Sequence, residues 1–393
     1  MRVGIHSLMT RFRAALPPLI LVACLVLTGA AAWWQDDSIG QKAQIDLVNH
    51  AEHIQAEVQR RFKHAEYGLH ALRGLYATGA KISRSQFAAY VTSRNIQKEF
   101  AGVQGFSFNQ RVQRSELDAF VAAQRLDGAP DFTVRQLGSN DHPDLYIVQS
   151  IEPAQRNQGV LGLEIGSESV RRQFLEQAVD RGEVTMTAPI TLVQNQKNLL
   201  GVLLLMPIYA NDSPPATVAL RRSELNGVLV APIAIDELLS DIPDISSGLF
   251  NVEVFDTTAA PSQTIFDSDP TSRADISNKT QANLRYSTQL GLPLYGRELA
   301  ILVDGREPFT AAIDHRSTGL ILVLGTLLSS LLFMHLRRLQ KEQSLIAMEV
   351  KQRARELERE RGRLKTILET STDGIYILDA SGLLVQANPA MLR

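Results

Sequence analysis

The sequence predicts an α+β protein that also carries two membrane-spanning helices. Three observations support this fold class. Short apolar or alternating runs are interspersed with segments whose apolar residues recur every three or four positions. The runs in the second half follow one another at hairpin-like spacing, which favours antiparallel sheet. Two longer runs are apolar throughout. The six runs that we predict as strands are 102–108, 132–137, 145–151, 159–165, 227–235 and 250–256.

The two long apolar runs are predicted to cross a lipid bilayer. Residues 14–34 contain no charged residue, and residues 317–336 contain only His335. Each run is long enough to span a hydrocarbon layer about 30 Å thick. Arginine and lysine residues precede the first run and follow the second, so both termini are predicted to be cytoplasmic and residues 35–316 to be periplasmic or extracellular. A cleaved signal peptide is the alternative for the first run, and it would also export the middle of the chain.

Composition excludes several classes of protein. The 393 residues carry a formal net charge of −2, so no nucleic-acid partner is expected. Cys24, the only cysteine, lies inside the first apolar run, so the exported part has no disulfide framework. That part must fold around a hydrophobic core, which about 280 residues are enough to form.

Two further segments have helical periodicity, and both suit a dimer. Apolar residues from Leu47 to Tyr76 recur at steps of three or four and predict a stalk helix that ends at Gly79. The alternative is an ordinary helix packed on its own domain. From Leu336 to Ile367 the steps alternate strictly between three and four, which predicts a cytoplasmic parallel coiled coil and hence a homodimer. A single amphipathic helix on the membrane surface is the alternative. Two shorter helices are predicted from capping-box spacings at Ser83 and at Ser115.

The chain ends on a short hairpin pattern. Residues 371–393 indicate a strand, a tight turn at residues 380–382, a second strand and the start of a helix. Because an isolated two-stranded hairpin is only marginally stable in water, we interpret this end as the opening of a further domain.

Local signatures of common enzymes do not occur in the sequence. It has no HExxH, GxSxG, Walker-type glycine loop or CxxC. No catalytic residue, cofactor or metal ion is therefore predicted. His50, His53 and Glu57 share one helical face, but such a pattern on a stalk is more often a solvated surface than a metal site.

A candidate binding wall lies in the segment 187–209, which holds two apolar runs around a polar pentapeptide. Because its second run has only 11 residues, we interpret the segment as a strand hairpin and not as a membrane span. Thr187, Pro189, Thr191 and Val193 are expected on one face of the first strand, and the residues between them on the other. An apolar wall with two hydroxyls suits a small molecule, and plain core packing is the alternative.

The segments 146–194, 201–209 and 225–239 closely resemble the CHASE family, the extracytoplasmic sensory domains of bacterial and plant receptors. The resemblance runs from roughly residue 70 to residue 275. It implies a long stalk helix followed by two PAS-like α/β subdomains, of which the membrane-distal one carries the ligand pocket. Residues 367–391 look like the first part of a cytoplasmic PAS domain. Receptors of this arrangement are usually histidine kinases or diguanylate cyclases.

The resemblance also implies a set of ligand-binding residues. In plant relatives the hairpin binds cytokinins. The family's threonine before the proline corresponds to Thr187, whereas Leu205 stands where the plant receptors have a second threonine. The lost hydroxyl argues against adenine recognition and for another small molecule. The expected ligand-binding residues are Thr187, Pro189, Thr191, Val193, Leu203 and Leu205.

These predictions together describe the input half of a dimeric transmembrane receptor. Its expected partners are a small-molecule ligand, the lipid bilayer of the bacterial inner membrane and a second copy of the chain. A membrane-tethered exported enzyme or adhesion module is the alternative of another class. The expected order is a cytoplasmic N-terminus (1–13), a first span (14–34), a stalk helix (35–80), a distal subdomain (81–220), a proximal subdomain (221–316), a second span (317–336), a coiled coil (337–370) and the start of a PAS domain (371–393).

Overall fold

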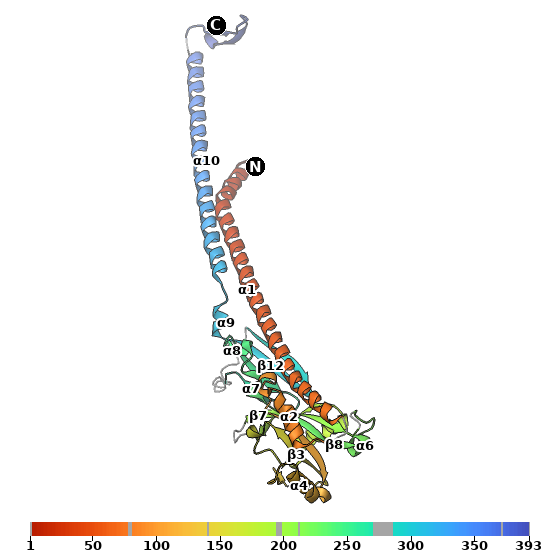
Figure 1. The fold of residues 1–393 in the computed structure, drawn as a ribbon. Helices are drawn as coiled ribbons and strands as arrows, with labels where there is room; N and C mark the ends of the chain where they lie inside the picture. The colour runs from red at the N-terminus through yellow and green to blue at the C-terminus, as the bar shows by residue number, and fades with distance from the viewer. Residues whose placement is uncertain are drawn as a thin grey trace. The chain divides into compact units, whose positions relative to one another are not determined.

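The computed structural model divides into two compact units. Residues 40–313 form one unit, and residues 1–39 together with 314–393 form the other. The structure describes residues 2–77, 81–139, 141–193, 199–210, 213–269, 286–370 and 372–392. The unit of residues 40–313 contains both helices and strands, so the α+β prediction is confirmed (Figure 1).

The described helices differ greatly in length. Two are long: α1 (Arg2–Tyr76) and α10 (Arg316–Thr370). The others are α2 (Arg84–Ser93), α3 (Ile96–Glu99), α4 (Leu117–Leu126), α5 (Ser169–Arg181), α6 (Val218–Ser223), α7 (Ile235–Leu239), α8 (Pro243–Ser246) and α9 (Glu307–Ala311). Short 3₁₀ turns cover residues 114–116, 154–156, 165–167 and 389–392.

The strands of the described residues form three sheets. The largest has the order β2-β4-β3-β1-β8-β7-β5, and β6 also pairs with β7. Its strands are β1 (Phe106–Gln113), β2 (Arg135–Gln136), β3 (Asp144–Glu152), β4 (Leu163–Glu164), β5 (Thr185–Met186), β6 (Ile190–Leu192), β7 (Leu199–Tyr209) and β8 (Leu225–Ala234). The second sheet, of order β10-β9-β12-β11, contains β9 (Phe250–Asp256), β10 (Gln263–Asp267), β11 (Ser287–Leu294) and β12 (Arg297–Gly305). β13 (Tyr376–Leu378) and β14 (Leu384–Ala387) form a hairpin.

The two larger sheets define two subdomains within residues 40–313. β8 lies in the large sheet between β1 and β7, so this sheet extends beyond the expected boundary at residue 220. The change from one sheet to the other falls between Ala234 and Phe250, a stretch that holds α7 and α8. Neighbouring strands pair antiparallel throughout both sheets except for β2 and β4, which run parallel.

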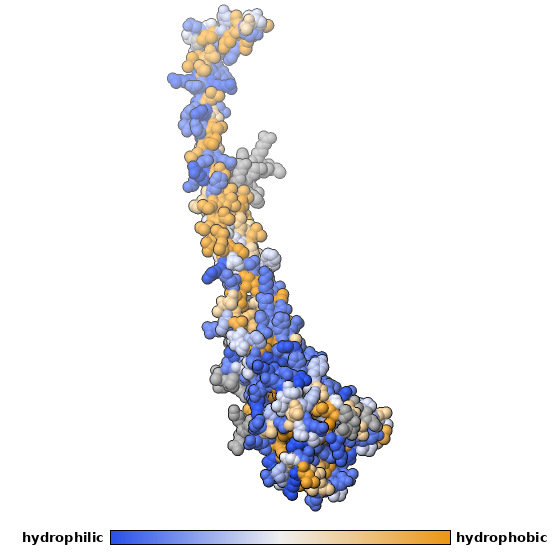
Figure 2. All heavy atoms as spheres, viewed as in Figure 1, coloured by the Kyte–Doolittle hydropathy of each residue, from blue (hydrophilic) through white to orange (hydrophobic). Residues whose placement is uncertain are grey.

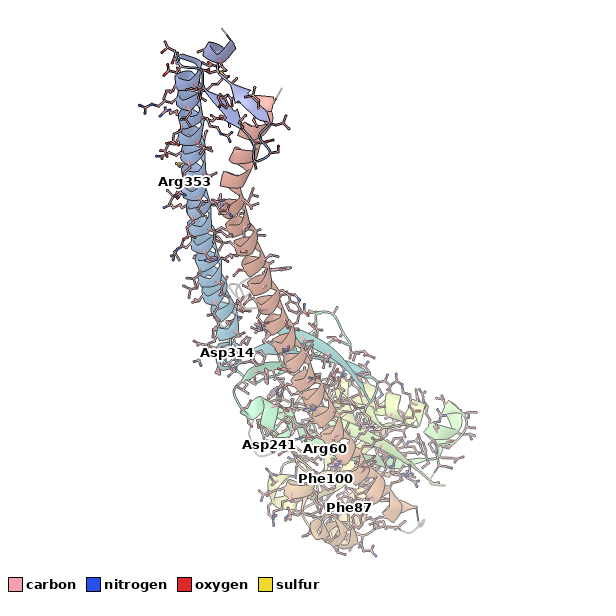
Figure 3. The ribbon with its side chains drawn as sticks, turned by 90° about the horizontal axis from the view of Figure 1, so that it is seen from above. Arg60, Phe87, Phe100, Asp241, Asp314 and Arg353 are labelled. Carbon is pink, nitrogen blue, oxygen red and sulfur yellow. The ribbon has the colours of Figure 1, made fainter. Side chains whose placement is uncertain are left out.

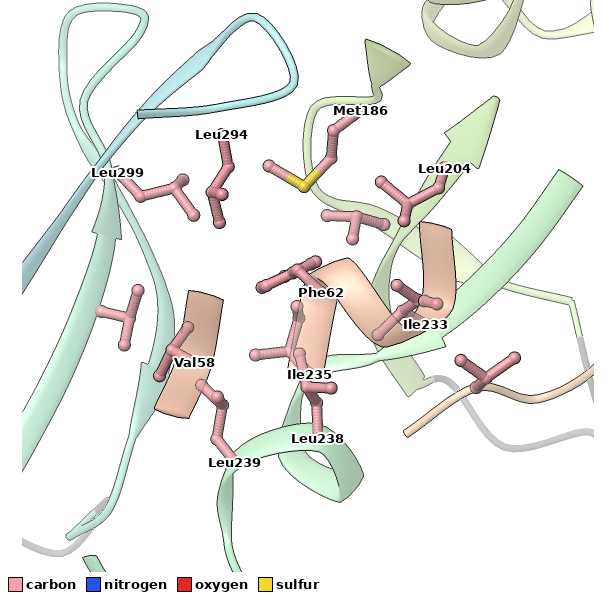
Figure 4. Packing of buried hydrophobic residues seen from close by; sticks show 14 of the residues in the cluster. Val58, Phe62, Met186, Leu204, Ile233, Ile235, Leu238, Leu239, Leu294 and Leu299 are labelled. Atoms are coloured by element: carbon pink, nitrogen blue, oxygen red, sulfur yellow. The ribbon is translucent and has the colours of Figure 1, made fainter. Parts of the chain in front are cut away.

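The stalk stripe predicted from the sequence is confirmed in α1. The residues of the stripe from Leu47 to Leu72 are at most 2% exposed. They belong to one core cluster with residues of both larger sheets. Figure 4 shows Phe62 of α1 between Met186 and Leu204 of the large sheet and Leu294 and Leu299 of the small one. The helix therefore packs on its own domain, and it is also continuous with the first apolar run. Gly79, the expected end, lies outside the described residues.

Of the two capping boxes predicted from the sequence, one is present in the structure and the other is not. The capping box at Ser83 is present, because the Ser83 hydroxyl accepts from Gln86 N and the Gln86 side chain accepts from Ser83 N. The predicted box at Ser115 is wrong: residues 114–116 form a 3₁₀ turn, and α4 starts after Glu116 without a side-chain cap. The runs 132–137 and 159–165 form strands of two residues each.

The unit that holds both apolar runs contains two candidate membrane helices. Parts of α1 and α10 are long and apolar enough to cross a bilayer, and Figure 2 shows apolar side chains gathered over them. The helices approach closely: a Cβ on Gly325 would lie 2.3 Å from Thr28 Cγ2. Just outside the two apolar runs, His315 Nδ1 lies 2.8 Å from Asp36 Oδ1. Trp33 and Trp34, which we expect at the membrane interface, are both about 70% exposed.

α10 continues beyond the second span as a single helix to Thr370. Figure 3 shows side chains projecting from all sides of this helix, among them Arg353. The predicted strand, turn and strand after it are confirmed by β13 and β14, and a 3₁₀ turn occupies residues 389–392. Asp379 holds the turn between the strands, because its carboxylate accepts hydrogen bonds from the hydroxyl and N–H of Ser381 and from Leu383 N. These bonds lower the pKa of Asp379.

Candidate ligand-binding site

The large sheet has two buried faces, and the candidate site lies on the face that looks away from α1. Alternate residues of β7 separate the faces: Leu204 belongs to the α1 core, whereas Leu203 and Leu205 belong to a second apolar layer. α5 covers this second layer with Leu175, Ala178 and Val179. A helix laid on a sheet in this way forms a closed apolar compartment.

A small cavity of about 30 Å³ lies within this second layer. Its wall is mostly apolar and draws on six strands, α5 and the segments between them. The lining residues are Ser107, Asn109, Val148, Val160, Leu163, Ile165, Arg171, Leu192, Val193, Leu203, Val230 and Pro232. An apolar cavity that holds a few polar groups is the usual form of a small-molecule site.

Asn109 supplies the most informative polar group of the cavity. The residue is fully buried. Its amide nitrogen donates to Val228 O at 3.2 Å and to the Ser107 hydroxyl at 3.3 Å. Because the Val228 carbonyl can only accept, it fixes the nitrogen on that side and leaves Oδ1 on the other. Among the described residues no group donates to Asn109 Oδ1. A buried acceptor without a donor costs about 1–3 kcal/mol.

Among the residues that the structure describes, Arg171 brings the only charged side chain to the cavity wall. It sits in the first turn of α5, where the carboxylate of Glu168 caps the helix by accepting from Val170 N and Arg171 N. The guanidinium is 7% exposed and donates to Glu168 Oε2 at 3.1 Å and to Thr191 O at 2.9 Å. Burial alone would raise the pKa of Glu168, but the two backbone N–H groups and the Arg171 charge lower it. The pair is therefore ionised and internally neutral.

The residues predicted for the site are only partly brought together around the cavity. Val193 and Leu203 line it, and Leu205 lies in the same apolar layer, paired with Thr185. Thr187 is buried, but its hydroxyl accepts from Leu203 N at 3.0 Å and so completes the pairing with β7. The Thr191 side chain is exposed and Pro189 is half-buried. Thr191 contributes through its carbonyl, which holds Arg171.

Asn109, Ser107 and Arg171 are the polar cavity residues that sequence reasoning missed. The signal for the first two is the alternation in "FSFN", residues 106–109. Phe106 and Phe108 point into the α1 core, which places the two polar residues on the opposite, equally buried face. No comparable local signal marks Arg171.

A second, larger cleft of about 490 Å³ lies where the two subdomains meet. Acidic and basic side chains line it, among them Glu66, Glu183 and Arg181. The Tyr295 hydroxyl donates to Glu66 at 2.9 Å, and the backbone oxygen of Tyr295 accepts from Met186 N. Burial and the neighbouring Glu66 raise the pKa of Tyr295. These contacts tie the hairpin β11–β12 to α1 and β5, so we interpret the cleft as a joint and not as the principal site.

A family model matches residues 80–266, the part of the chain that builds both the large sheet and the cavity, and the model is that of the CHASE domain. The chain contains a CHASE domain. This match confirms the resemblance that the sequence indicated. CHASE domains are extracytoplasmic ligand-binding sensor domains of signalling receptors.

Solved structures of bacterial receptors resemble part of this chain. One is an extracellular ligand binding receptor from Desulfohalobium retbaense, at 13% identity and a TM-score of 0.40, covering 66% of this chain but only 39% of that one. Another is the periplasmic sensory domain of the Campylobacter jejuni chemoreceptor Tlp1, at 11% identity and a TM-score of 0.41, covering 70% of this chain and 98% of that one. No curated protein sequence matches the chain.

Proposed function

We propose that the chain is the sensory part of a membrane receptor and that its CHASE domain binds a small molecule in the cavity beside Asn109. The observation that supports this proposal is the buried Asn109 Oδ1, which accepts no hydrogen bond from any described residue. A ligand that donates a hydrogen bond there removes a cost of about 1–3 kcal/mol, so the site is prepared for such a partner. The proposed ligand contacts are Asn109, Arg171, Val193 and Leu203, which line the cavity. Thr187, Pro189, Thr191 and Leu205 do not line it and are proposed only as the wider surroundings of the site.

Filling the cavity tests this proposal. Leu203→Phe adds an aromatic ring to the cavity wall, and we expect it to abolish stabilisation of the full chain in nanodiscs by any hit from a thermal-shift screen of small metabolites. Leu204→Phe is the matched control, because it makes the same change one residue along β7 but on the face that packs on α1. It should cost about 1–3 kcal/mol through overpacking and leave ligand-induced stabilisation intact. Ligand binding that survives Leu203→Phe would place the site elsewhere.

The proposed topology carries the signal inward. Residues 14–34 and 317–336 cross the bacterial inner membrane, both termini are cytoplasmic and residues 35–316 are periplasmic. Ligand binding shifts the two spans relative to one another, and α10 passes this shift to a PAS domain that begins in residues 371–393. An output domain then responds to the shift. This domain is proposed to be a histidine kinase or, alternatively, a diguanylate cyclase. A coupling of 1–3 kcal/mol between the ligand site and the spans is the usual scale for such receptors.

The proposed homodimer rests on the apolar stripe of α10. The stripe includes four apolar members of the three-four pattern, each about 60% exposed in the single chain: Ile346, Val350, Leu357 and Leu364. An exposed stripe of this spacing is buried when two parallel helices form a coiled coil.

Cysteine cross-linking in membranes tests the coiled coil. In a Cys24→Ser background, which removes the only native thiol, we expect Ile346→Cys to form an intermolecular disulfide at least tenfold faster than Met348→Cys. The two residues are equally exposed in the single chain, at 62% and 64%, but only Ile346 is a core position of the heptad pattern. Equal rates at the two positions would contradict a parallel coiled coil.

A further inference from the structure

The electrostatics of the cavity restrict the ligand more tightly than its shape does. Arg171 is the only charged residue among the described residues that line the wall. It is already neutralised by Glu168 at 3.1 Å, and a second of its nitrogens donates to Thr191 O. The other two polar wall residues, Ser107 and Asn109, are uncharged and at most 3% exposed. A charged ligand would therefore enter a largely buried compartment in which the described residues offer no unpaired counter-ion, and the cost of desolvating such a charge is several kcal/mol.

The orientation of Asn109 defines which group the ligand must bring. Val228 O and the Ser107 hydroxyl hold the amide nitrogen, so only Oδ1 is presented to the cavity. An acceptor oxygen is satisfied by an N–H or O–H donor and not by a carbonyl or carboxylate. The remaining wall residues, such as Val148, Leu203 and Val230, are aliphatic and require an apolar body.

We infer that the CHASE domain recognises an uncharged molecule with a small branched apolar body and an N–H donor, of the amide class, whose N–H bonds Asn109 Oδ1. This inference rests on the proposed function, since it concerns the chemistry of the same site. The cavity of about 30 Å³ is far smaller than the roughly 300–1,000 Å³ of usual small-molecule pockets, so the ligand must widen it. Val193, 38% exposed, is the wall residue whose displacement opens it outward.

Three probes of equal shape separate the possible ligand classes. Isobutyramide is uncharged and donates N–H, isobutyrate is anionic, and 3-methyl-2-butanone is uncharged but only accepts. With the full chain in nanodiscs, we expect isobutyramide alone to produce a saturable thermal stabilisation and saturable ligand-observed NMR signals. Asn109→Leu should weaken isobutyramide by a factor of about 5 to 100, which is the loss of one hydrogen bond to a buried acceptor.

Asn157→Leu is the matched control for this experiment. Asn157 is also fully buried with an amide oxygen that has no donor among the described residues, but it does not line the cavity. Its replacement should leave the isobutyramide affinity unchanged. The inference would be overturned if isobutyrate bound more tightly than isobutyramide, if all three probes bound equally, or if none of them bound. It would also be overturned if the Asn109→Leu chain bound isobutyramide like wild type. A ligand of another class that is lost in Leu203→Phe would still support the proposed function.

Discussion

Replacing Phe62 with alanine is expected to lower the free energy of unfolding of the unit formed by residues 40–313 by about 3–5 kcal/mol. Phe62 is 2% exposed and lies on α1 where the cores of both sheets converge (Figure 4). Because α1 is packed from both sides there, neighbouring side chains cannot collapse into the space that the ring leaves, and a cavity remains. Pulse proteolysis in urea on the full chain in nanodiscs measures the change.

Tyr67→Ala serves as the control for this prediction. Tyr67 is on the same helix and also aromatic, but its side chain is 62% exposed, so its loss should change stability by no more than about 0.5 kcal/mol. A Phe62→Ala variant as stable as Tyr67→Ala would mean that α1 does not form the common core of the two subdomains.

Long-period features of the chain were predictable from the sequence because each depends on many residues at once. The α1 stripe has members at every turn from Leu47 to Leu72, so no single misplaced residue hides it. The capping box at Ser83 is a local pattern that the structure also contains. At Ser115 the same spacing fails, because the preceding residues form a 3₁₀ turn that shifts the helix start to Leu117.

The details of the site were less predictable, since they depend on where a strand is interrupted. Strict alternation from Thr187 to Val193 presumes one continuous strand, but β5 ends at Met186 and β6 begins at Ile190. Pro189 lies in the gap and has no N–H for the ladder. Thr187 consequently turns its hydroxyl to Leu203 N, and the face assignment of the following residues no longer follows from counting.

Hydrogen bonds between residues that are far apart in the chain could not be predicted from the sequence either. The adjacent Arg171 and Arg172 look like the solvated face of α5, yet both are less than 9% exposed. Arg171 is held by Thr191 O, and Arg172 by Gly166 O and Asp144 O. The segment that supplies Thr191 O adjoins Arg171 only after the large sheet has assembled. A buried arginine is therefore a consequence of the tertiary structure, which local periodicity does not report.

The buried ion pair of the small sheet leads to the second large effect. Arg297 on β12 donates through Nε and one terminal nitrogen to Asp256 Oδ2 on β9, and the two residues are 6% and 3% exposed. The guanidinium also lies over the ring of Phe174 on α5, 5.1 Å from its centroid, and so joins the two subdomains. Arg297→Met leaves the carboxylate buried without its counter-ion. We expect a loss of about 3–5 kcal/mol in the same urea experiment.

Two comparisons separate the cost of an orphaned charge from that of lost packing. The double variant Arg297→Met with Asp256→Leu removes both charges, and we expect it to be more stable than Arg297→Met alone by at least 2 kcal/mol, since apolar replacement of a whole buried pair is often neutral. Arg222→Met breaks a pair of the same chemistry with Asp180, but Arg222 is 63% exposed, so that change should cost less than about 1 kcal/mol. If the double variant were as unstable as Arg297→Met, packing of the guanidinium against Phe174, and not charge compensation, would be what holds this joint together.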